Sequence, residues 1–187
     1  MSYLVVSATK AEAAYVPADV PVVITGVGKT AAAVAVTRAL AELPNRDDLV
    51  VVNIGSAGAL RDGMAGVYEP AAVWNHDLSA DAIRALGFDP QDVLELSDEE
   101  GVLLATGDMF VSDPAVRDAL AQRAHMVDME GFAVVWAARS FGVPVRLIKH
   151  ISDNADEGAM EWVTLVDRSA RALAERLAEI MSAAERT

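Results

Sequence analysis

The chain has 187 residues, of which 53% are apolar, and it carries 15 Lys and Arg against 28 Asp and Glu, a net charge of −13. This length and apolar content favour a single domain with a sizeable core and argue against disorder. The acidic balance argues against binding to nucleic acid, and the absence of cysteine excludes a disulfide scaffold, thiolate zinc sites and a cysteine nucleophile.

Membrane insertion and secretion are not expected from this sequence. The first residues lack a basic segment followed by a long apolar stretch, so they do not resemble a signal peptide. No apolar run approaches the ~20 residues that a membrane-spanning helix needs. We therefore expect a soluble, cytoplasmic protein.

Short apolar runs alternate along the chain with Ala-rich helical patterns. The runs are rich in β-branched residues and bounded by Gly, Pro or Asp, which is typical of strands covered on both faces. The expected strands are Tyr3–Val6, Val20–Thr25, Leu49–Ile54, Val67–Val73, Val102–Ala105, Met126–Met129 and Val145–Ile151. The expected helices are Lys29–Leu43, Pro114–Arg123, Gly131–Phe141 and a final helix from about Met160 to Ala184.

This alternation predicts an α/β fold over residues 1–187, with a mostly parallel or mixed twisted sheet flanked by helices on both faces. Ser112 and Asp113 are candidate N-caps for the helix that begins at Pro114. His76–Glu100 is acidic, so we expect a solvated insertion there, with a short helix near Asp81–Leu86. Functional residues should gather where the strands end, at the carboxyl edge of the sheet.

Two glycine-rich turns follow expected strands. Gly26–Thr30 looks like the end of a P-loop, but that motif requires another glycine at the position of Val23, so triphosphate hydrolysis is disfavoured. Asn53–Gly58 places two glycines around Ser56, which suits a loop where the backbone approaches a ligand closely. Either turn is also compatible with a purely structural role.

Carboxylates end two further strands. In Met126–Gly131, Asp128 and Glu130 come to one side if both are extended, with Met129 opposite. Asp128 and Glu130 could instead be acids at a helix N-terminus, where the helix macrodipole favours negative charge. They could also bind a metal together with a histidine, but the sequence shows no metal-ligand spacing. The histidines considered are His76, His125 and His150, and we expect His150 to be a packed or capping residue.

The second of these strands, Val145–Ile151, runs into Ser152, Asp153 and further acceptors. Another carboxylate that reaches the same sheet edge indicates acid–base chemistry.

Five motifs occur in an order that resembles the purine nucleoside phosphorylase/nucleosidase superfamily. They are Gly26–Lys29, Asn53–Gly58, Thr106–Phe110, Val127–Gly131 and Ile151–Asp156. The closest resemblance is to the methylthioadenosine/S-adenosylhomocysteine nucleosidases. It implies a nucleoside phosphorylase-like fold, a small purine nucleoside as substrate, no metal or other cofactor, no nucleic-acid or membrane partner, and a homodimer.

The resemblance also implies roles for the catalytic residues. Glu12 matches the carboxylate that activates the attacking water, and Ser56 matches the serine that orients the catalytic carboxylates. Asp153 matches the acid that protonates N7 of the departing purine. Cleaving an N-glycosidic bond passes through an oxocarbenium-like sugar, which such carboxylates suit. The acid must keep its proton near neutral pH, which requires a pKa raised by burial or like charge.

The substrate-binding residues follow from the same resemblance. Glu130 matches the glutamate that holds the ribose hydroxyls, and Met129 the methionine that lies against the sugar. Phe110 sits where the family stacks an aromatic ring on the base, and the Val111 backbone where it hydrogen-bonds the base edge. The implied reaction is hydrolysis of an adenine-type ribonucleoside, with or without a 5′ modification, to free base and ribose.

Two alternatives stay open, a phosphate-dependent phosphorylase and a catalytically silent nucleoside-binding protein. Similar phosphorylases place an arginine where this chain has Asn53, and an amide offers no charge to phosphate. Arg61 lies just past that loop, where we expect a surface role. Compared with the family, Ala13–Thr25 lacks a hairpin. His76–Glu100 is also condensed, in a region that helps a neighbouring subunit close the 5′ side of the pocket in relatives.

Overall fold

A computed structural model describes residues 1–156 and 162–184 of the chain. Its strands form one mixed sheet in the order β2-β1-β3-β8-β7-β5-β6, with β9 paired to β3 and β4 paired to β9. The strands are β1 (Ser2–Ser7), β2 (Val22–Ile24), β3 (Leu49–Ala59), β4 (Val67–Tyr68), β5 (Ala72–Asn75), β6 (Val93–Glu95), β7 (Leu103–Thr106), β8 (Met126–Asp128) and β9 (Val145–Asp153).

The long strand β3 organises the sheet. One of its edges pairs in parallel with β1, from Leu49 to Asn53, and then antiparallel with β8 at Gly58 and Ala59. Its other edge pairs in parallel with β9 from Val51 to Gly58. Because β1, β3 and β9 run parallel, their carboxyl ends meet on one side of the molecule. β8 reaches the end of β3 from the opposite direction, so the loop after β8 arrives at the same place.

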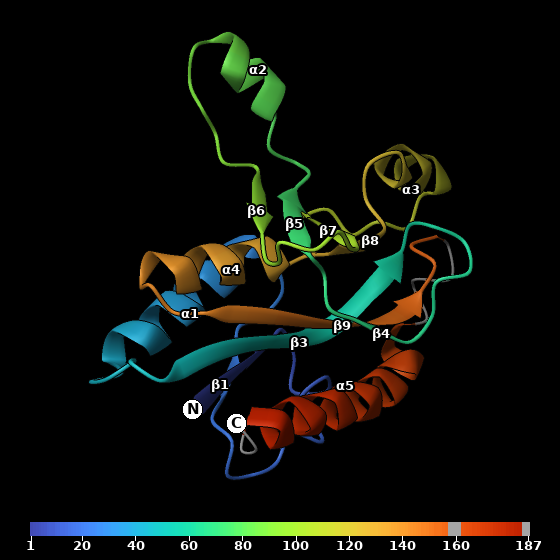
Figure 1. The fold of residues 1–187 in the computed structure, drawn as a ribbon. Coiled ribbons are helices and arrows are strands. Elements are labelled where there is room, and N and C mark those ends of the chain that lie inside the picture. The colour runs from blue at the N-terminus through green and yellow to red at the C-terminus, as the bar shows by residue number, and fades with distance from the viewer. Residues whose placement is uncertain (157–161, 185–187) are drawn as a thin grey trace.

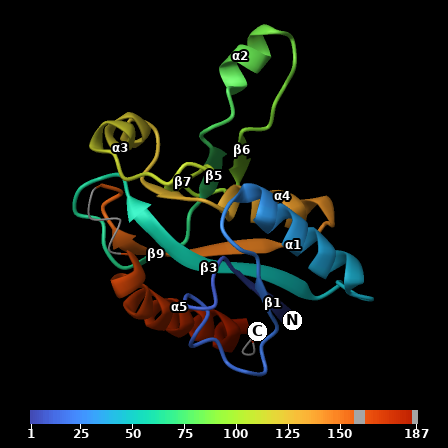
Figure 2. The ribbon, with the colours of Figure 1, turned by 180° about the vertical axis from the view of Figure 1, so that it is seen from behind.

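Helices cover both faces of the sheet, as the alternation of runs predicts (Figure 1, Figure 2). The helices are α1 (Lys29–Glu42), α2 (Ala80–Ala85), α3 (Pro114–Ala121), α4 (Gly131–Ser140) and α5 (Trp162–Ala184). α1 and α4 lie side by side on one face and α5 lies along the other. Met160, where the final helix was expected to begin, lies outside the described residues.

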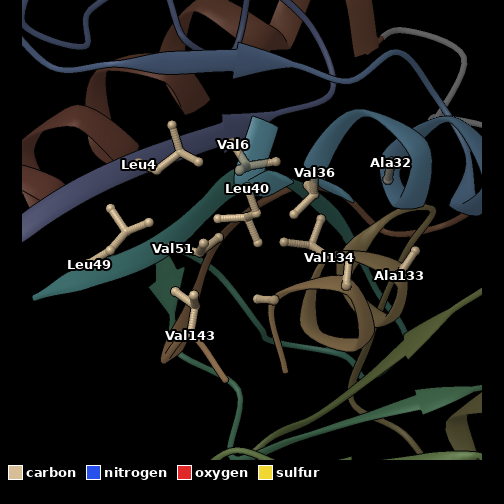
Figure 3. Packing of buried hydrophobic residues seen from close by; sticks show 12 residues of the cluster. Leu4, Val6, Ala32, Val36, Leu40, Leu49, Val51, Ala133, Val134 and Val143 are labelled. Atoms are coloured by element: carbon tan, nitrogen blue, oxygen red, sulfur yellow. The ribbon is translucent and has the colours of Figure 1, made fainter. Parts of the chain in front are cut away.

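The core between α1, α4 and the sheet consists of small and branched aliphatic side chains (Figure 3). Val36 and Leu40 of α1 meet Val134 of α4 above Val6 and Val51, and all five are fully buried. The other face has its own cluster, in which Leu173 and Leu177 of α5 pack on the sheet. Burial of side chains this size contributes roughly 1.5–3 kcal/mol each, so both faces hold the sheet in place.

The expectation of one strand over Val67–Val73 is wrong. The chain forms two strands there, because Pro70 has no N–H to continue the ladder. β4 pairs with β9, whereas β5 turns to the far end of the sheet and pairs with β6 and β7.

His76–Glu100 is more ordered than expected. β6 pairs antiparallel with β5, and α2 lies at the tip of the arm that projects from the sheet between them (Figure 1). Val93 and Leu94 form this strand within an otherwise acidic segment, and Leu94 packs into the core. The short helix was correctly expected near Asp81–Leu86. Asp113 is the N-cap of α3, where its carboxylate accepts the Ala115 N–H.

Candidate active site

A cavity of about 240 Å³ opens at the carboxyl ends of the central strands. It lies where β1, β3 and β9 end and where the loops after β2, β7 and β8 begin, the position expected for a ligand in such a sheet. Every residue that the resemblance singled out lines this cavity: Glu12, Ser56, Phe110, Val111, Met129, Glu130 and Asp153. Segments from all parts of the sequence therefore meet at one place.

Glu12 is almost completely buried and is held by four hydrogen-bond donors. The Ser56 N–H and hydroxyl donate to its Oε1 at 2.9 and 2.8 Å. The Thr9 N–H and hydroxyl donate to Oε2 at 3.2 and 2.9 Å. Charge-assisted donors of this kind fix a carboxylate in one orientation. The short turn after β1 thus presents Glu12 to the cavity as a rigid acceptor.

Glu130 follows β8 and is buried against the glycine turn after β2. The Gly28 N–H donates to its Oε1 at 2.8 Å. Gly28 adopts a φ of 97°, which side-chain-bearing residues rarely take up, so glycine is needed for this approach. Burial, together with the nearby charge of Asp128, raises the pKa of Glu130 from 4.5 to about 7. Near neutral pH this carboxyl group exists in both its charged and neutral forms.

Asp128 lies behind Glu130 and forms a buried ion pair with Lys149. The Lys149 Nζ is 2.8 Å from Asp128 Oδ2, and both side chains are 1% exposed. The Thr106 hydroxyl and the Gly131 N–H also donate to Asp128, at 2.5 and 2.8 Å. Asp128 therefore satisfies the amide at the start of α4, as the helix-acid alternative proposed, and also fixes the turn that carries Glu130.

The condition for the alternation expected around Met129 is not met. β8 ends at Asp128, so Glu130 is no longer extended, with φ −132° and ψ −30°. Asp128, Met129 and Glu130 all line the cavity.

Asp153 ends β9 and is held in a tight turn. Its Oδ1 accepts the Ala155 N–H at 2.8 Å, and the Ser152 hydroxyl donates to its Oδ2 at 2.6 Å. Ala155 has a φ of 51°, a left-handed conformation that costs an L-residue about 1–2 kcal/mol. Gly58 of β3 lies against this turn, and a Cβ there would come within 2.8 Å of the Ala155 Cβ and 3.1 Å of Asp153 Oδ1.

Phe110 and Val111 belong to the loop between β7 and α3. Phe110 is 48% exposed at the cavity mouth, whereas Val111 is buried. Asp108 anchors the loop, since its carboxylate accepts the Lys29 N–H at 2.7 Å and its own N–H donates to Asp77 at 2.8 Å. An exposed ring beside a carboxylate-lined cavity suits stacking on a flat heterocycle.

The described walls of the cavity carry no positively charged side chain. No lysine or arginine is among the described residues that line it. Arg61 is exposed and donates to the Ala124 carbonyl at 3.2 Å, which matches the expected surface role. Asn53 is buried beneath the cavity, where its amide donates to the Val6 carbonyl at 3.0 Å.

The three histidines were considered as metal ligands together with Asp128 and Glu130. Within residues 1–156 and 162–184, no group of three or more His, Asp or Glu side chains is arranged to hold a metal ion. His150 is buried and hydrogen-bonded to Ser169 at 2.9 Å, so it is the packed residue expected. His125 accepts the Leu103 N–H at 3.0 Å.

Three site residues do not belong to any of the sequence motifs. Thr9 and Lys149 hold Glu12 and Asp128, and Trp162 lines the cavity and donates its indole N–H to Ser56 at 2.7 Å. Trp162 lies within the final helix that the sequence predicts, with no motif around it to indicate a role in the site. A lysine inside an otherwise apolar strand is a signal that points to a buried partner, because unpaired charges are not found there.

Comparison with known proteins places this architecture in a family. Residues 69–185 match the model of the phosphorylase superfamily. A 5′-methylthioadenosine/S-adenosylhomocysteine nucleosidase from a Shewanella species is 30% identical over 163 residues, which cover 74% of this chain and 69% of the relative. The aminodeoxyfutalosine nucleosidase of Helicobacter pylori is 33% identical over 102 residues, 53% of this chain and 44% of the relative.

Among solved structures, a 5′-methylthioadenosine/S-adenosylhomocysteine nucleosidase of Helicobacter pylori superposes with a TM-score of 0.83 at 22% identity, covering 97% of this chain and 98% of that one. The chain therefore belongs to the phosphorylase superfamily and, within it, to the 5′-methylthioadenosine/S-adenosylhomocysteine nucleosidase family. This confirms the resemblance and the mixed α/β fold class. N-glycosyl hydrolysis, the predicted reaction type, is the activity for which these relatives are named.

Proposed function

We propose that the protein hydrolyses the N-glycosidic bond of an adenine-type ribonucleoside with a substituent at the 5′ position. The observation that carries this proposal is the meeting of Glu12, Glu130 and Asp153 around one cavity. An oxocarbenium-like transition state needs negative charge beside the sugar, a positioned nucleophile and an acid for the leaving group. Three carboxyl groups from three different turns supply these functions.

Glu12 acts as the general base in this scheme. Its four donors leave the carboxylate fixed at the cavity wall, where it accepts a proton from a water that attacks C1′ of the sugar. Ser56 orients it through two of those hydrogen bonds. Asp153, held by Ser152 and the turn after β9, donates its proton to N7 as the bond to the base breaks.

The remaining residues bind the substrate. Glu130 accepts hydrogen bonds from the 2′- and 3′-hydroxyls of the ribose, and Met129 lies against the sugar ring. Phe110 stacks on the purine, and the Val111 backbone bonds its edge. All four line the cavity, and their roles are those that the sequence resemblance implies.

Water is a better candidate nucleophile than phosphate. A phosphorylase must hold a dianion, and bidentate arginine contacts are the usual means. The described cavity wall contains no arginine or lysine, and Asn53 is a neutral side chain whose amide N–H already donates to the Val6 carbonyl. These features support hydrolysis over phosphorolysis, and the intact set of three carboxyl groups supports a working enzyme over a silent binder.

We also propose that the protein is a homodimer of single-domain subunits and that it is located in the cytoplasm. Several apolar side chains on α1, α4 and the projecting arm are more than 45% exposed, a feature that supports association. They are Val34, Leu86, Phe88 and Trp136. A chain without cysteine does not depend on an oxidising compartment. Light scattering of the purified protein and cell fractionation test these two points.

A substrate panel tests the proposed function. Adenosine, 5′-methylthioadenosine, S-adenosylhomocysteine, aminodeoxyfutalosine and inosine are incubated with the purified protein, and free base is measured by chromatography. We expect release of adenine from the 5′-substituted nucleosides and little or no hypoxanthine from inosine. No release of base from any of them contradicts the proposal.

A further inference from the structure

Trp162 connects the last helix to the candidate general base. It is the first residue of α5 and is 106 positions from Ser56 in the chain, yet its indole Nε1–H donates to the Ser56 hydroxyl oxygen at 2.7 Å. That hydroxyl in turn donates to Glu12 Oε1 at 2.8 Å. The three side chains form one continuous hydrogen-bonded chain along the cavity wall.

The chemistry of the three groups fixes the direction of this chain. An indole N–H only donates, and a serine hydroxyl has a single proton with free rotation about its C–O bond. Because the Ser56 oxygen accepts from Trp162, its proton is left for Glu12. Linked hydrogen bonds of this kind also strengthen one another in a buried site.

Without the indole donor, the Ser56 hydroxyl is free to turn towards other acceptors. Glu12 Oε1 would then keep only the Ser56 N–H, at 2.9 Å, as a fixed donor from this side. The Thr9 contacts to Oε2 do not depend on Trp162. The loss would therefore be a partial misalignment of the carboxylate rather than the collapse of the turn.

We propose that Trp162 is a positioning residue for hydrolysis, which acts through the Ser56 hydroxyl to aim Glu12 at the attacking water. This inference rests on the proposed function. It differs from a role in which the Trp162 ring only packs against the ligand, because a phenylalanine ring would perform that role nearly as well. The N–H group, and not the ring, is what the proposal requires.

A double-mutant cycle separates these roles. Trp162→Phe keeps an aromatic ring without the donor, and we expect kcat to fall about three- to tenfold, the effect of one neutral hydrogen bond, while KM stays within about twofold. Ser56→Ala should remove the same coupling, so adding Trp162→Phe to it should change kcat little further. Trp74→Phe, a matched change at a tryptophan of β5 that does not line the cavity, should leave both constants unchanged.

Independent losses that multiply in the double variant overturn the proposal, as does a Trp162→Phe enzyme that differs from wild type in KM alone. The hydrogen bond is also measurable without activity. The chain has three tryptophans, so a ¹H–¹⁵N spectrum shows three indole resonances. The Trp162 resonance, assigned by its loss in Trp162→Phe, should move upfield in Ser56→Ala while the other two stay in place.

An unmoved Trp162 resonance in Ser56→Ala contradicts the inference even if the enzyme is active. A wild-type protein that releases no base contradicts the proposed function instead, and in that case the spectrum still decides whether the Trp162–Ser56 contact exists. The two failures are therefore distinguishable. The spectrum of Ser56→Ala retains Trp162 itself, so it does not depend on whether Trp162→Phe folds.

Discussion

Replacing Glu130 with glutamine is expected to stabilise the folded protein at neutral and alkaline pH. Burial beside Asp128 raises the pKa of Glu130 from 4.5 to about 7. Between these two values the native state keeps a proton that the unfolded chain has lost, so the free energy of unfolding falls as pH rises. The difference between the two pKa values corresponds to a loss of roughly 3 kcal/mol in the free energy of unfolding.

Glu130→Gln removes this penalty. The glutamine keeps an oxygen to accept the Gly28 N–H but does not ionise. We expect the difference in unfolding free energy between variant and wild type to grow by roughly 3 kcal/mol in favour of the variant from pH 4.5 to 8, with most of the change before pH 7. Urea denaturation followed by tryptophan fluorescence at several pH values measures this difference.

A matched control is Glu175→Gln, on the exposed surface of α5, which should change the free energy of unfolding by less than about 0.5 kcal/mol. A difference between Glu130→Gln and wild type that does not change with pH would refute the assignment of a buried carboxyl group with a raised pKa at this position. The gain in stability should coincide with a loss of activity. Losing the charged contact to the ribose hydroxyls should lower kcat/KM by roughly ten- to a hundredfold, and much less for a substrate without those hydroxyls.

Three further substitutions test other parts of the site. Asp153→Asn cannot donate a proton to the leaving base, so kcat should fall ~10²–10⁴-fold in steady-state kinetics. Ligand affinity measured by calorimetry should be largely kept. Turnover near the wild-type rate would remove Asp153 from the mechanism. Gly58→Ala should clash with the turn that holds Asp153, lowering the free energy of unfolding by about 1–3 kcal/mol and reducing kcat. Gly63→Ala, where a φ of 80° strains alanine but no atom lies within 4 Å of its Cβ, should lower stability and leave kcat unchanged. Lys149→Met should cost about 3–5 kcal/mol by leaving the Asp128 charge buried and unpaired. Adding Asp128→Asn should recover part of that stability in urea denaturation, and no recovery would mean that the pair itself is not the cause.

The strands and helices could be predicted from the sequence because they are coded by local patterns. Buried β-branched runs such as Leu49–Ile54 depend only on neighbouring residues. The same holds for the apolar stripe of α5, which consists of Val166, Leu173, Leu177 and Ile180. Pro70 marks the break between β4 and β5 in the sequence, but the apolar residues on either side of it favour one continuous strand. β6 was missed because its short apolar run lies in an acidic segment and is defined by its pairing with β5, a non-local property.

In the site too, local features could be predicted from the sequence and non-local ones could not. Residues inside ordered motifs, such as Ser56 and Asp153, were found because each motif is contiguous in the sequence. Partnerships between distant segments were not found, since nothing near Trp162 indicates that its indole bonds a residue 106 positions away. The raised pKa of Glu130 likewise depends on burial and on the charge of Asp128, which Lys149 partly offsets, and this arrangement forms only when β8 and β9 come together.

The central claim is that water, and not phosphate, cleaves the bond to the base. The most direct measurement follows adenine release from 5′-methylthioadenosine in phosphate-free buffer and identifies the sugar product by mass spectrometry. The account predicts a free 5′-substituted ribose, formed at a rate that added phosphate does not change. A rate that requires phosphate, with accumulation of a ribose 1-phosphate product, would contradict it.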